Sequence, residues 1–472
     1  MESDAGIEAP PEPGLSRALW DAVRGTRQDY TQGPVGRAIL LLAVPMVLET
    51  VMESVFAVVD VFWVSRLGHQ AVTTVGLTES MLAIVYTVAV GLSIGATAMV
   101  ARRIGEKDAE GAARTAVQCV ALGLGVAAVI GVIGATQAPR LLALMGAGPE
   151  VIETGAAYTR VMLGANFTVT LLFLMNAIFR GTGDAVIAMR VLWLANGINL
   201  VLDPLLIFGI GPFPELGVQG AAVATNIGRG TAVVVQLALL LRGTGRVNIE
   251  RRHLRLVPAI MLRLVRLSAT GTFQVFIGTA SWIGLVRVLA GFGSEVVAGY
   301  TVAIRVIIFA LFPSWGMSNA AATMVGQALG ARDPARAERA VWIAGRYNVV
   351  FLGAAGTLFL IFAPQLIGLF TTDPEPFRQG VLCLRIISLG FPFYGFGMVL
   401  TQSFNGAGDT WTPTYLNMVC FWLVEIPLAF VLAYRTDVGP SGVYIAVAVA
   451  FSLLAVVSGL MFRRGGGKQK VV

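Results

Sequence analysis

The amino-acid sequence predicts an all-α polytopic membrane protein with twelve transmembrane helices in two six-helix lobes related by a parallel repeat. Three observations support this fold class: the composition, the length of the apolar runs and a repeated set of loop motifs. The 472 residues are 56% hydrophobic and 13% charged, whereas soluble proteins carry about a quarter charged residues. Apolar runs such as 116–135 and 443–460 have the length of about 20 residues that a helix needs to cross a bilayer.

Apolar runs and the turn signals between them place six helices in each half of the chain. In the first half the expected spans are 38–64, 75–100, 117–137, 156–178, 188–210 and 219–241. In the second half they are 263–290, 298–323, 342–363, 380–403, 414–434 and 440–461. The start of the chain is acidic and Pro-rich, without the basic segment of a signal peptide, so we expect a disordered tail of about thirty residues.

These spans divide the chain into five expected units. They are a cytoplasmic N-terminal tail (1–35), an N-lobe (36–242), a cytoplasmic linker (243–262), a C-lobe (263–462) and a basic cytoplasmic tail (463–472). The two termini and the predicted loops on their side hold 25 of the 34 Lys and Arg residues. Positive residues are enriched on the cytoplasmic side of membrane proteins. We therefore expect a multi-pass protein of the cell (inner) membrane with both termini in the cytoplasm, and the net charge of +7 needs no nucleic acid.

Loop motifs recur in the two halves at a nearly constant offset. The stretch "MVARRIGEKDAEGAAR" from Met99 corresponds to "MVGQALGARDPARAER" from Met324, and "FRGTGD" from Phe179 corresponds to "FNGAGD" from Phe404. Six helices per repeat preserve the orientation, so the repeats are related by an axis along the membrane normal. Transporters move two such lobes about a site near the middle of the membrane, and the sequence therefore favours a transporter.

Polar residues inside three predicted helices of the N-lobe form the main candidate site. Asp60 in the first helix, Asn199 and Asp203 in the fifth and Thr225 in the sixth share roughly one depth, in the outer half of the bilayer. A carboxylate inside a span is disfavoured by about 2.5–3.5 kcal/mol on insertion scales, so it usually has a function. Packing between helices is the alternative. Either H⁺ or Na⁺ suits two carboxylates with an amide and a hydroxyl nearby, and no other metal is expected.

A second tier of polar residues has a role that the sequence leaves open. Glu49 and Glu53 lie on the same helical face as Asp60 but nearer the cytoplasm, and Asn196 shares the face of the fifth helix that carries the candidate site. Pro45, fifteen residues before Asp60, is expected to kink the first helix, either as a static bend or as a hinge.

Glu425 stands shortly before Pro427 in the eleventh helix, where a structural role is slightly favoured. Arg305 in the eighth helix is expected to pair with an acid or to extend towards the interface.

No sequence pattern indicates an enzyme or a cofactor. The three cysteines, Cys119, Cys383 and Cys420, lie inside apolar segments and are expected to be buried without a disulfide or a metal framework. The chain has only two histidines, His69 and His253.

Together, these motifs resemble the multidrug and toxic compound extrusion (MATE) family, most closely its DinF-like branch. The resemblance covers about residues 35–460 and rests on "VDVFWVSRLG", "FRGTGD", "NLVLDP" and "GQALGARDPARAERA". It implies two six-helix lobes around a central cleft, and export of bulky, often cationic amphiphiles against an inward flow of H⁺ or Na⁺. It also implies that the N-lobe cation site of the family falls on Asp60, Asn199, Asp203 and Thr225.

The chain departs from the family pattern in the C-lobe. Where other branches carry coupling acids, this chain has Gln274 and, near the second position, Tyr394. We therefore expect coupling to rest on the N-lobe. The expected partners are small amphiphilic or cationic substrates and the lipid bilayer, with no nucleic acid, and the chain is expected to act as a monomer.

Alternative functions remain at this point. A flippase for lipid-linked oligosaccharides or peptidoglycan precursors needs several basic residues in its cavity, and only Arg229, Arg287 and Arg305 lie within the predicted spans. An intramembrane enzyme needs a nucleophile or clustered metal ligands at one interface. Uptake of a small metabolite is also open, because topology does not fix the direction of transport.

Overall fold

Helices account for all the regular structure in the part of the chain that the computed structural model describes, residues 15–25, 29–243 and 245–465. Eleven helical segments there are long and apolar enough to span a membrane, and a further pair of helices, bent by 58° at a short break, forms a twelfth. The predicted all-α, twelve-helix architecture is therefore confirmed.

The helices of the N-lobe follow the six predicted spans. They are α2 (Val35–Ser65), α3 (His69–Gly105), α4 (Ala109–Leu144), α5 (Pro149–Gly164) continued by α6 (Phe167–Thr182), α7 (Ala185–Phe208) and α8 (Val218–Arg242). A short 3₁₀ helix, η1 (Arg251–Leu254), lies in the linker to the second half. Most helices extend several residues beyond the apolar stretch that predicted them, because charged residues at the helix ends continue the helical backbone.

The helices of the C-lobe repeat this order. They are α9 (Pro258–Ala290), α10 (Ser294–Gly330), α11 (Pro334–Gly368), α12 (Pro374–Leu389) continued by α13 (Phe391–Gly406), α14 (Trp411–Asn417), the π-helical η2 (Met418–Glu425), α15 (Ile426–Tyr434) and α16 (Ser441–Arg463). In both halves the fourth span is broken at the same place, between α5 and α6 and between α12 and α13.

The turns repeat as well as the helices. Asp108 caps α4 by accepting a hydrogen bond from the Gly111 amide (2.7 Å), and Asp333 caps α11 in the same way through the Arg336 amide (2.8 Å). The residue before each cap adopts a positive φ of about 60°. Such agreement in backbone detail supports the sequence repeat.

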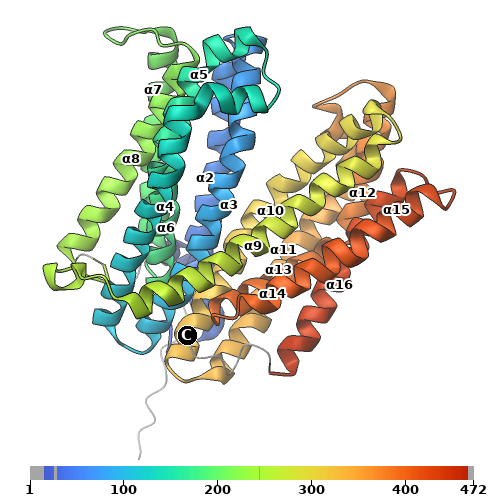
Figure 1. The fold of residues 1–472 in the computed structure, drawn as a ribbon. Helices are drawn as coiled ribbons and strands as arrows, with labels where there is room; N and C mark the ends of the chain where they lie inside the picture. The colour runs from blue at the N-terminus through green and yellow to red at the C-terminus, as the bar shows by residue number, and fades with distance from the viewer. Residues whose placement is uncertain (1–14, 26–28, 244, 466–472) are drawn as a thin grey trace, which may run out of the picture.

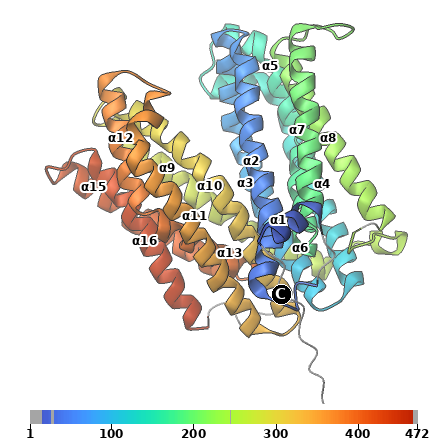
Figure 2. The same cartoon turned by 180° about the vertical axis from the view of Figure 1, so that it is seen from behind.

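The two lobes form a V (Figures 1 and 2). They meet at the end of the molecule where α1 lies, here called the base, and they separate towards the opposite, open end. At the base the backbones of α3 and α10 touch. A Cβ on Gly105 would lie 2.0 Å from the Gln327 carbonyl oxygen, and one on Gly330 would lie 2.2 Å from the Arg102 carbonyl oxygen. Glycine is therefore required at this crossing of the lobes.

The expected disordered tail is wrong in its second half. Residues Leu15–Arg24 form the short helix α1, and Arg190 of α7 donates hydrogen bonds to the carbonyls of its last two residues, at 3.2 and 2.8 Å. The first fourteen residues lie outside the described part of the chain. The predicted boundaries of the five units stay a prediction.

Arg336 of α11 binds the non-helical segment that precedes α2. Its guanidinium donates three hydrogen bonds, at 2.8–2.9 Å, to the backbone carbonyls of Tyr30, Gln32 and Gly33. The Tyr30 ring lies 5.0 Å from the guanidinium carbon of Arg246, in the linker. Burial raises the pKa of Tyr30 to about 12, so its hydroxyl stays neutral. This clamp joins the C-lobe, the linker and the start of the N-lobe at the base.

Candidate functional site

Close packing of α7 against α8 brings the fifth- and sixth-helix residues of the candidate site together. A Cβ on Gly228 would lie 2.5 Å from the Ala195 carbonyl oxygen, so the two backbones are in contact. This approach allows the Asn199 amide nitrogen to donate to the Thr225 hydroxyl at 3.1 Å and to Asp203 Oδ1 at 3.2 Å. The common depth predicted for these three residues therefore corresponds to direct contact.

Two buried oxygens of this group have no hydrogen-bond partner. Asp203 is fully buried and Asn199 is 2% exposed, yet Asp203 Oδ2 and Asn199 Oδ1 each lack a donor. Buried acceptors are nearly always satisfied, because an unpaired one costs about 1–3 kcal/mol. With the Thr225 hydroxyl, these oxygens form a set of acceptors that suits a proton or a small cation.

Asp60 approaches the group from α2 and is half-buried. Its carboxylate is close enough to Asp203 for the two charges to interact, and it also interacts with Glu79 of α3 and with Arg229 of α8. The structure thus brings all four predicted site residues into one region of the N-lobe, with the two acids close enough for their charges to interact.

Glu53 lies two turns before Asp60 on the same face of α2 and belongs to a different set of contacts. Its Oε1 lies 3.6 Å from Nη2 of Arg229, and its Oε2 accepts a hydrogen bond of 3.4 Å from Asn196. The Arg229 guanidinium also lies over two aromatic rings, 5.5 Å from the centre of Phe56 and 5.9 Å from that of Tyr86. The second-tier residues Glu53 and Asn196 are therefore joined directly by a hydrogen bond, and Glu53 also pairs with the buried Arg229.

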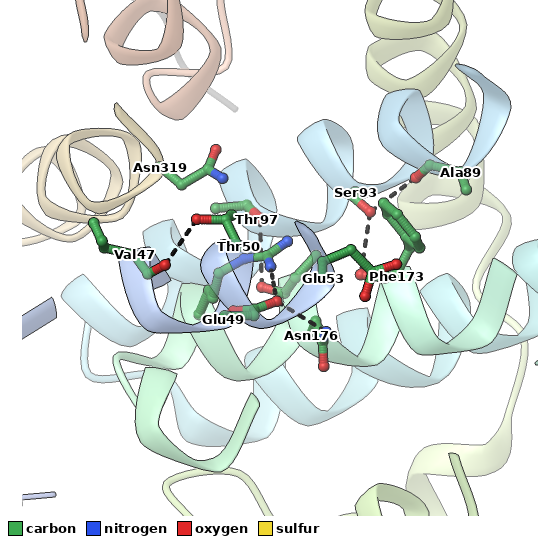
Figure 3. A network of polar contacts seen from close by, with 12 residues as sticks. Val47, Glu49, Thr50, Glu53, Ala89, Ser93, Thr97, Phe173, Asn176 and Asn319 are labelled. Atoms are coloured by element: carbon green, nitrogen blue, oxygen red, sulfur yellow. Dashed lines mark hydrogen bonds and ion pairs between the residues drawn. The ribbon is translucent and has the colours of Figure 1, made fainter. Parts of the chain in front are cut away.

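Glu49 is the most buried acid of α2 and forms a separate network with α6 (Figure 3). It is 5% exposed, and its Oε1 accepts from Asn176 (2.9 Å) and from Arg180 Nη1 (2.7 Å). Gln236 of α8 donates in turn to the Asn176 side chain at 2.6 Å. The other Glu49 oxygen has no partner. Glu49 thus holds a buried ion pair nearer the base than the candidate site.

Charges in this part of the N-lobe do not balance. Among the described residues between the levels of Glu49 and Asp203, the buried and half-buried acids are Glu49, Glu53, Asp60 and Asp203, and the bases are Arg180 and Arg229. The two arginines pair with the two glutamates. Asp60 and Asp203 form no ion pair among the described residues, although the charge of Arg229 also acts on Asp60 at longer range.

Pro45 lies within the continuous helix α2. Beside it, α10 of the C-lobe passes so close that a Cβ on Gly316 would lie 2.8 Å from the Met46 carbonyl group. An apolar pocket of about 250 Å³ adjoins this crossing, lined by Ala43, Val44, Val47, Leu48, Pro313, Met317, Asn348 and Phe351. The turn of α2 that contains Pro45 therefore has free space on one side and tight contact on the other.

The C-lobe residues show a different pattern. Gln274 is buried and its Oε1 has no partner, while Tyr394 stacks on Phe451 with 3.8 Å between ring centres. No hydrogen bond or ion pair within the described ranges joins Gln274 to Tyr394. Glu425 is 1% exposed, ends a π-helical stretch and has one carboxylate oxygen without a hydrogen-bond partner. Arg305 is exposed and its charge interacts with Glu79 of the N-lobe.

Sequence reasoning missed the two arginine pairs. The predicted fourth span ends at residue 178 and leaves Arg180 in a loop. In the structure α6 continues to Thr182 and places Arg180 opposite Glu49. A count of acids and bases along the helices could have suggested that each glutamate of α2 needs a partner. The residues described contain no group of three or more His, Cys, Asp or Glu that could hold a metal ion.

Comparison with known proteins extends this description. The family model MatE matches residues 45–205 and 272–431, which is more than half of the chain. The probable multidrug resistance protein YoeA of Bacillus subtilis is 26% identical over 90% of this chain and 93% of its own length. The probable multidrug resistance protein NorM of Thermotoga maritima is 26% identical over 93% of this chain and 94% of its own length.

A solved structure of a MATE protein in a straight conformation superimposes with a TM-score of 0.87 at 28% identity, covering 93% of this chain and 98% of that one. The DinF-like branch stays a prediction. The family match extends over both lobes and includes Asp60, Asn199 and Asp203. The chain belongs to the MATE family of transporters.

Proposed function

We propose that this protein is a cation-coupled antiporter that exports amphiphilic, often cationic, small molecules by alternating access. The observation that carries the proposal is the pair Asp60 and Asp203, which forms no ion pair among the described residues and adjoins unpaired buried oxygens of Asn199 and Asp203. Two of the relatives are named as probable multidrug resistance proteins, which supports drugs or toxic metabolites as the exported class.

Coupling follows from the charge of this pair. Two carboxylates facing each other in a lobe with few polar partners repel one another, and binding of H⁺ or Na⁺ removes the repulsion. The charge of the N-lobe interior then differs between the loaded and the empty state. Asn199 and Thr225 contribute a neutral amide and a hydroxyl, which position the loaded form without changing its charge.

The V shape is consistent with the outward-facing conformation of a transporter that works by alternating access. Positive residues favour a cytoplasmic location for the loops at the base and for both termini, so the open end faces the outside of the cell membrane. Cation binding at Asp60 and Asp203 allows α2 to move towards α7, with Pro45 as the flexible point. The cleft beside the N-lobe then narrows and releases the substrate outward. We propose that one chain performs this cycle as a monomer.

The alternatives carry less support. MATE proteins are transporters and not enzymes, which removes the intramembrane enzyme. A flippase for a pyrophosphate-linked lipid needs free basic side chains in its cavity, but Arg229 is already paired with Glu53. Uptake of a metabolite is distinguished from export by the direction of transport alone.

The test is transport in proteoliposomes loaded with a fluorescent cation such as ethidium. We expect export driven by an imposed pH or Na⁺ gradient in the wild type, and loss of gradient-driven export in well-folded Asp60→Asn and Asp203→Asn. Asn199→Ala and Thr225→Ala remove one neutral partner each and should reduce export more mildly. Export at the wild-type rate in either well-folded aspartate variant would refute the coupling role of that residue.

A further inference from the structure

Arg229 is a permanent charge placed directly next to the candidate coupling site. It is 6% exposed and lies four residues after Thr225 on α8, so the two side chains share a helical face one turn apart. A guanidinium keeps its charge at every physiological pH. A buried arginine inside a membrane lobe therefore adds a fixed positive charge to any ion-binding step that takes place there.

The contacts of Arg229 leave it incompletely satisfied. Nη2 lies 3.6 Å from Glu53 Oε1, beyond ordinary hydrogen-bond distance, and Nη1 is buried without a partner. The rings of Phe56 and Tyr86 cover the guanidinium. Such aromatic contacts stabilise a cation without fixing its donors in one direction. The group is held in place, yet it has donors free for a second acceptor.

That second acceptor is Asp60. Glu53 and Asp60 are seven residues apart on one face of α2, two turns or roughly 10 Å along the helix axis. Phe56 lies between them, and Arg229 contacts the Phe56 ring while its charge interacts with both acids. Arg229 thus lies between the carboxylates of Glu53 and Asp60 and can form a closer ion pair with either.

All titratable groups that face Arg229 can be named from the helices around it. Glu53 and Asp60 on α2, Tyr86 on α3 and Tyr158 on α5 interact with its charge, while Glu79 of α3 and Asp203 of α7 interact with Asp60. Among the described residues, Arg229 is the base whose charge interacts with Asp60, whereas Arg305 interacts with Glu79. Arg229 therefore competes with any external cation for the same acids.

We propose that Arg229 acts as a tethered cation that makes H⁺, rather than Na⁺, the coupling ion of this protein. The inference rests on the proposed antiport function. With Asp60 ionised, Arg229 shares its charge between Asp60 and Glu53; when Asp60 takes up a proton, Arg229 pairs with Glu53 alone. Na⁺ needs ionised carboxylates as ligands and is repelled by the guanidinium beside them. The same charge also disfavours protonation of Asp60, but a proton bonds covalently to one oxygen, whereas Na⁺ must gather several oxygen ligands for which the guanidinium donors compete.

The proposal is tested by removing the charge of Arg229 and following Na⁺. Wild-type protein in proteoliposomes should export ethidium under a pH gradient and not under a Na⁺ gradient at equal pH. We expect Arg229→Gln to acquire Na⁺-driven export. In detergent solution, its apparent affinity for ²²Na⁺ should rise by at least about tenfold, equivalent to about 1.4 kcal/mol.

Two further variants keep the test decisive. Arg180→Gln removes the other buried arginine, which pairs with Glu49 away from Asp60, and should gain no Na⁺ binding. Glu53→Gln combined with Arg229→Gln removes the whole pair, so a well-folded protein remains available if the single variant is unstable. Its Na⁺ binding should exceed that of the wild type but not that of the single variant, because the Glu53 charge that attracts Na⁺ is removed as well.

The outcomes separate this inference from the function on which it rests. A wild type that exports ethidium under neither gradient contradicts the antiport function itself. A wild type driven by Na⁺, or Arg229 variants that bind ²²Na⁺ no better than the wild type, would overturn the role of Arg229 and leave antiport intact.

Discussion

Removal of Arg180 should destabilise the protein in a way that depends on pH. In the Arg180→Met variant, the Glu49 carboxylate loses its charged partner and keeps only the hydrogen bond from Asn176. Breaking a buried ion pair by removing one partner typically costs about 3–5 kcal/mol. The variant can reduce this penalty by taking up a proton at Glu49 when it folds.

The size of that relief sets an upper limit on the destabilisation. Protonating a carboxyl costs roughly 1.36 kcal/mol for each pH unit above about 4.3, the ordinary pKa of a glutamate in water. The limit is therefore about 3.7 kcal/mol at pH 7 and about 1 kcal/mol at pH 5. Because the folded variant binds one more proton than the unfolded chain, its stability falls as the pH rises.

Thermal unfolding of the purified protein in detergent, followed by tryptophan fluorescence, measures this effect. The difference in midpoint between Arg180→Met and the wild type should be large at pH 7 and small at pH 5. Adding Glu49→Gln should recover most of the loss at pH 7, because no unpaired charge then remains buried. An equal loss at both pH values, or a double variant no more stable than Arg180→Met, would refute the reasoning.

Four further predictions concern other parts of the molecule. Gly316→Ala should lower the unfolding midpoint, since its Cβ meets the α2 backbone at 2.8 Å and overpacking of this kind costs about 1–3 kcal/mol; an unchanged midpoint would contradict it. Arg336→Met should speed hydrogen exchange in residues 29–34 because three charge-assisted hydrogen bonds are lost; mass spectrometry measures this rate. Gln274→Ala and Tyr394→Phe should leave the ion dependence of export unchanged, and a shift in either would extend coupling into the C-lobe. Pro45→Ala should slow turnover while substrate binding stays nearly intact, and spin-label distances between α2 and α7 that are equal at pH 5 and pH 8 would disprove the hinge.

The fold was largely predictable because the hydrophobic effect and the bilayer dictate it. Twelve apolar runs became twelve spans, since every backbone group in hydrocarbon must be satisfied within a helix. The common depth of Asn199 and Thr225 was predictable from helical periodicity, and the structure adds their direct contact. Depth alone does not give the lateral approach, which depends on Gly228 and its neighbours along α7 and α8.

The parts that escaped prediction depend on interactions without a local sequence signal. Arg336 binds backbone carbonyls, which every residue has, so the side chains of residues 30–33 contain no pattern that predicts this interaction. Arg180 and Glu49 are 131 residues apart, and the end of α6 had to be known before they could be paired. The helix α1 is short and polar, and composition favoured a flexible tail over it.

The N-lobe interior holds four acids and two arginines, and the two excess acids determine how much charge each transport cycle moves across the membrane. If Asp60 and Asp203 each load one proton outside and release it inside, exchange for one monovalent cation carries one net positive charge into the cell per cycle. An interior-negative potential of 100 mV then adds about 2.3 kcal/mol to each cycle, roughly a fiftyfold gain in the attainable substrate gradient. A neutral substrate would draw on two charges and therefore on twice that voltage-dependent energy. Membrane voltage alone, at equal pH on both sides, should accordingly drive export, and more strongly for neutral than for cationic substrates.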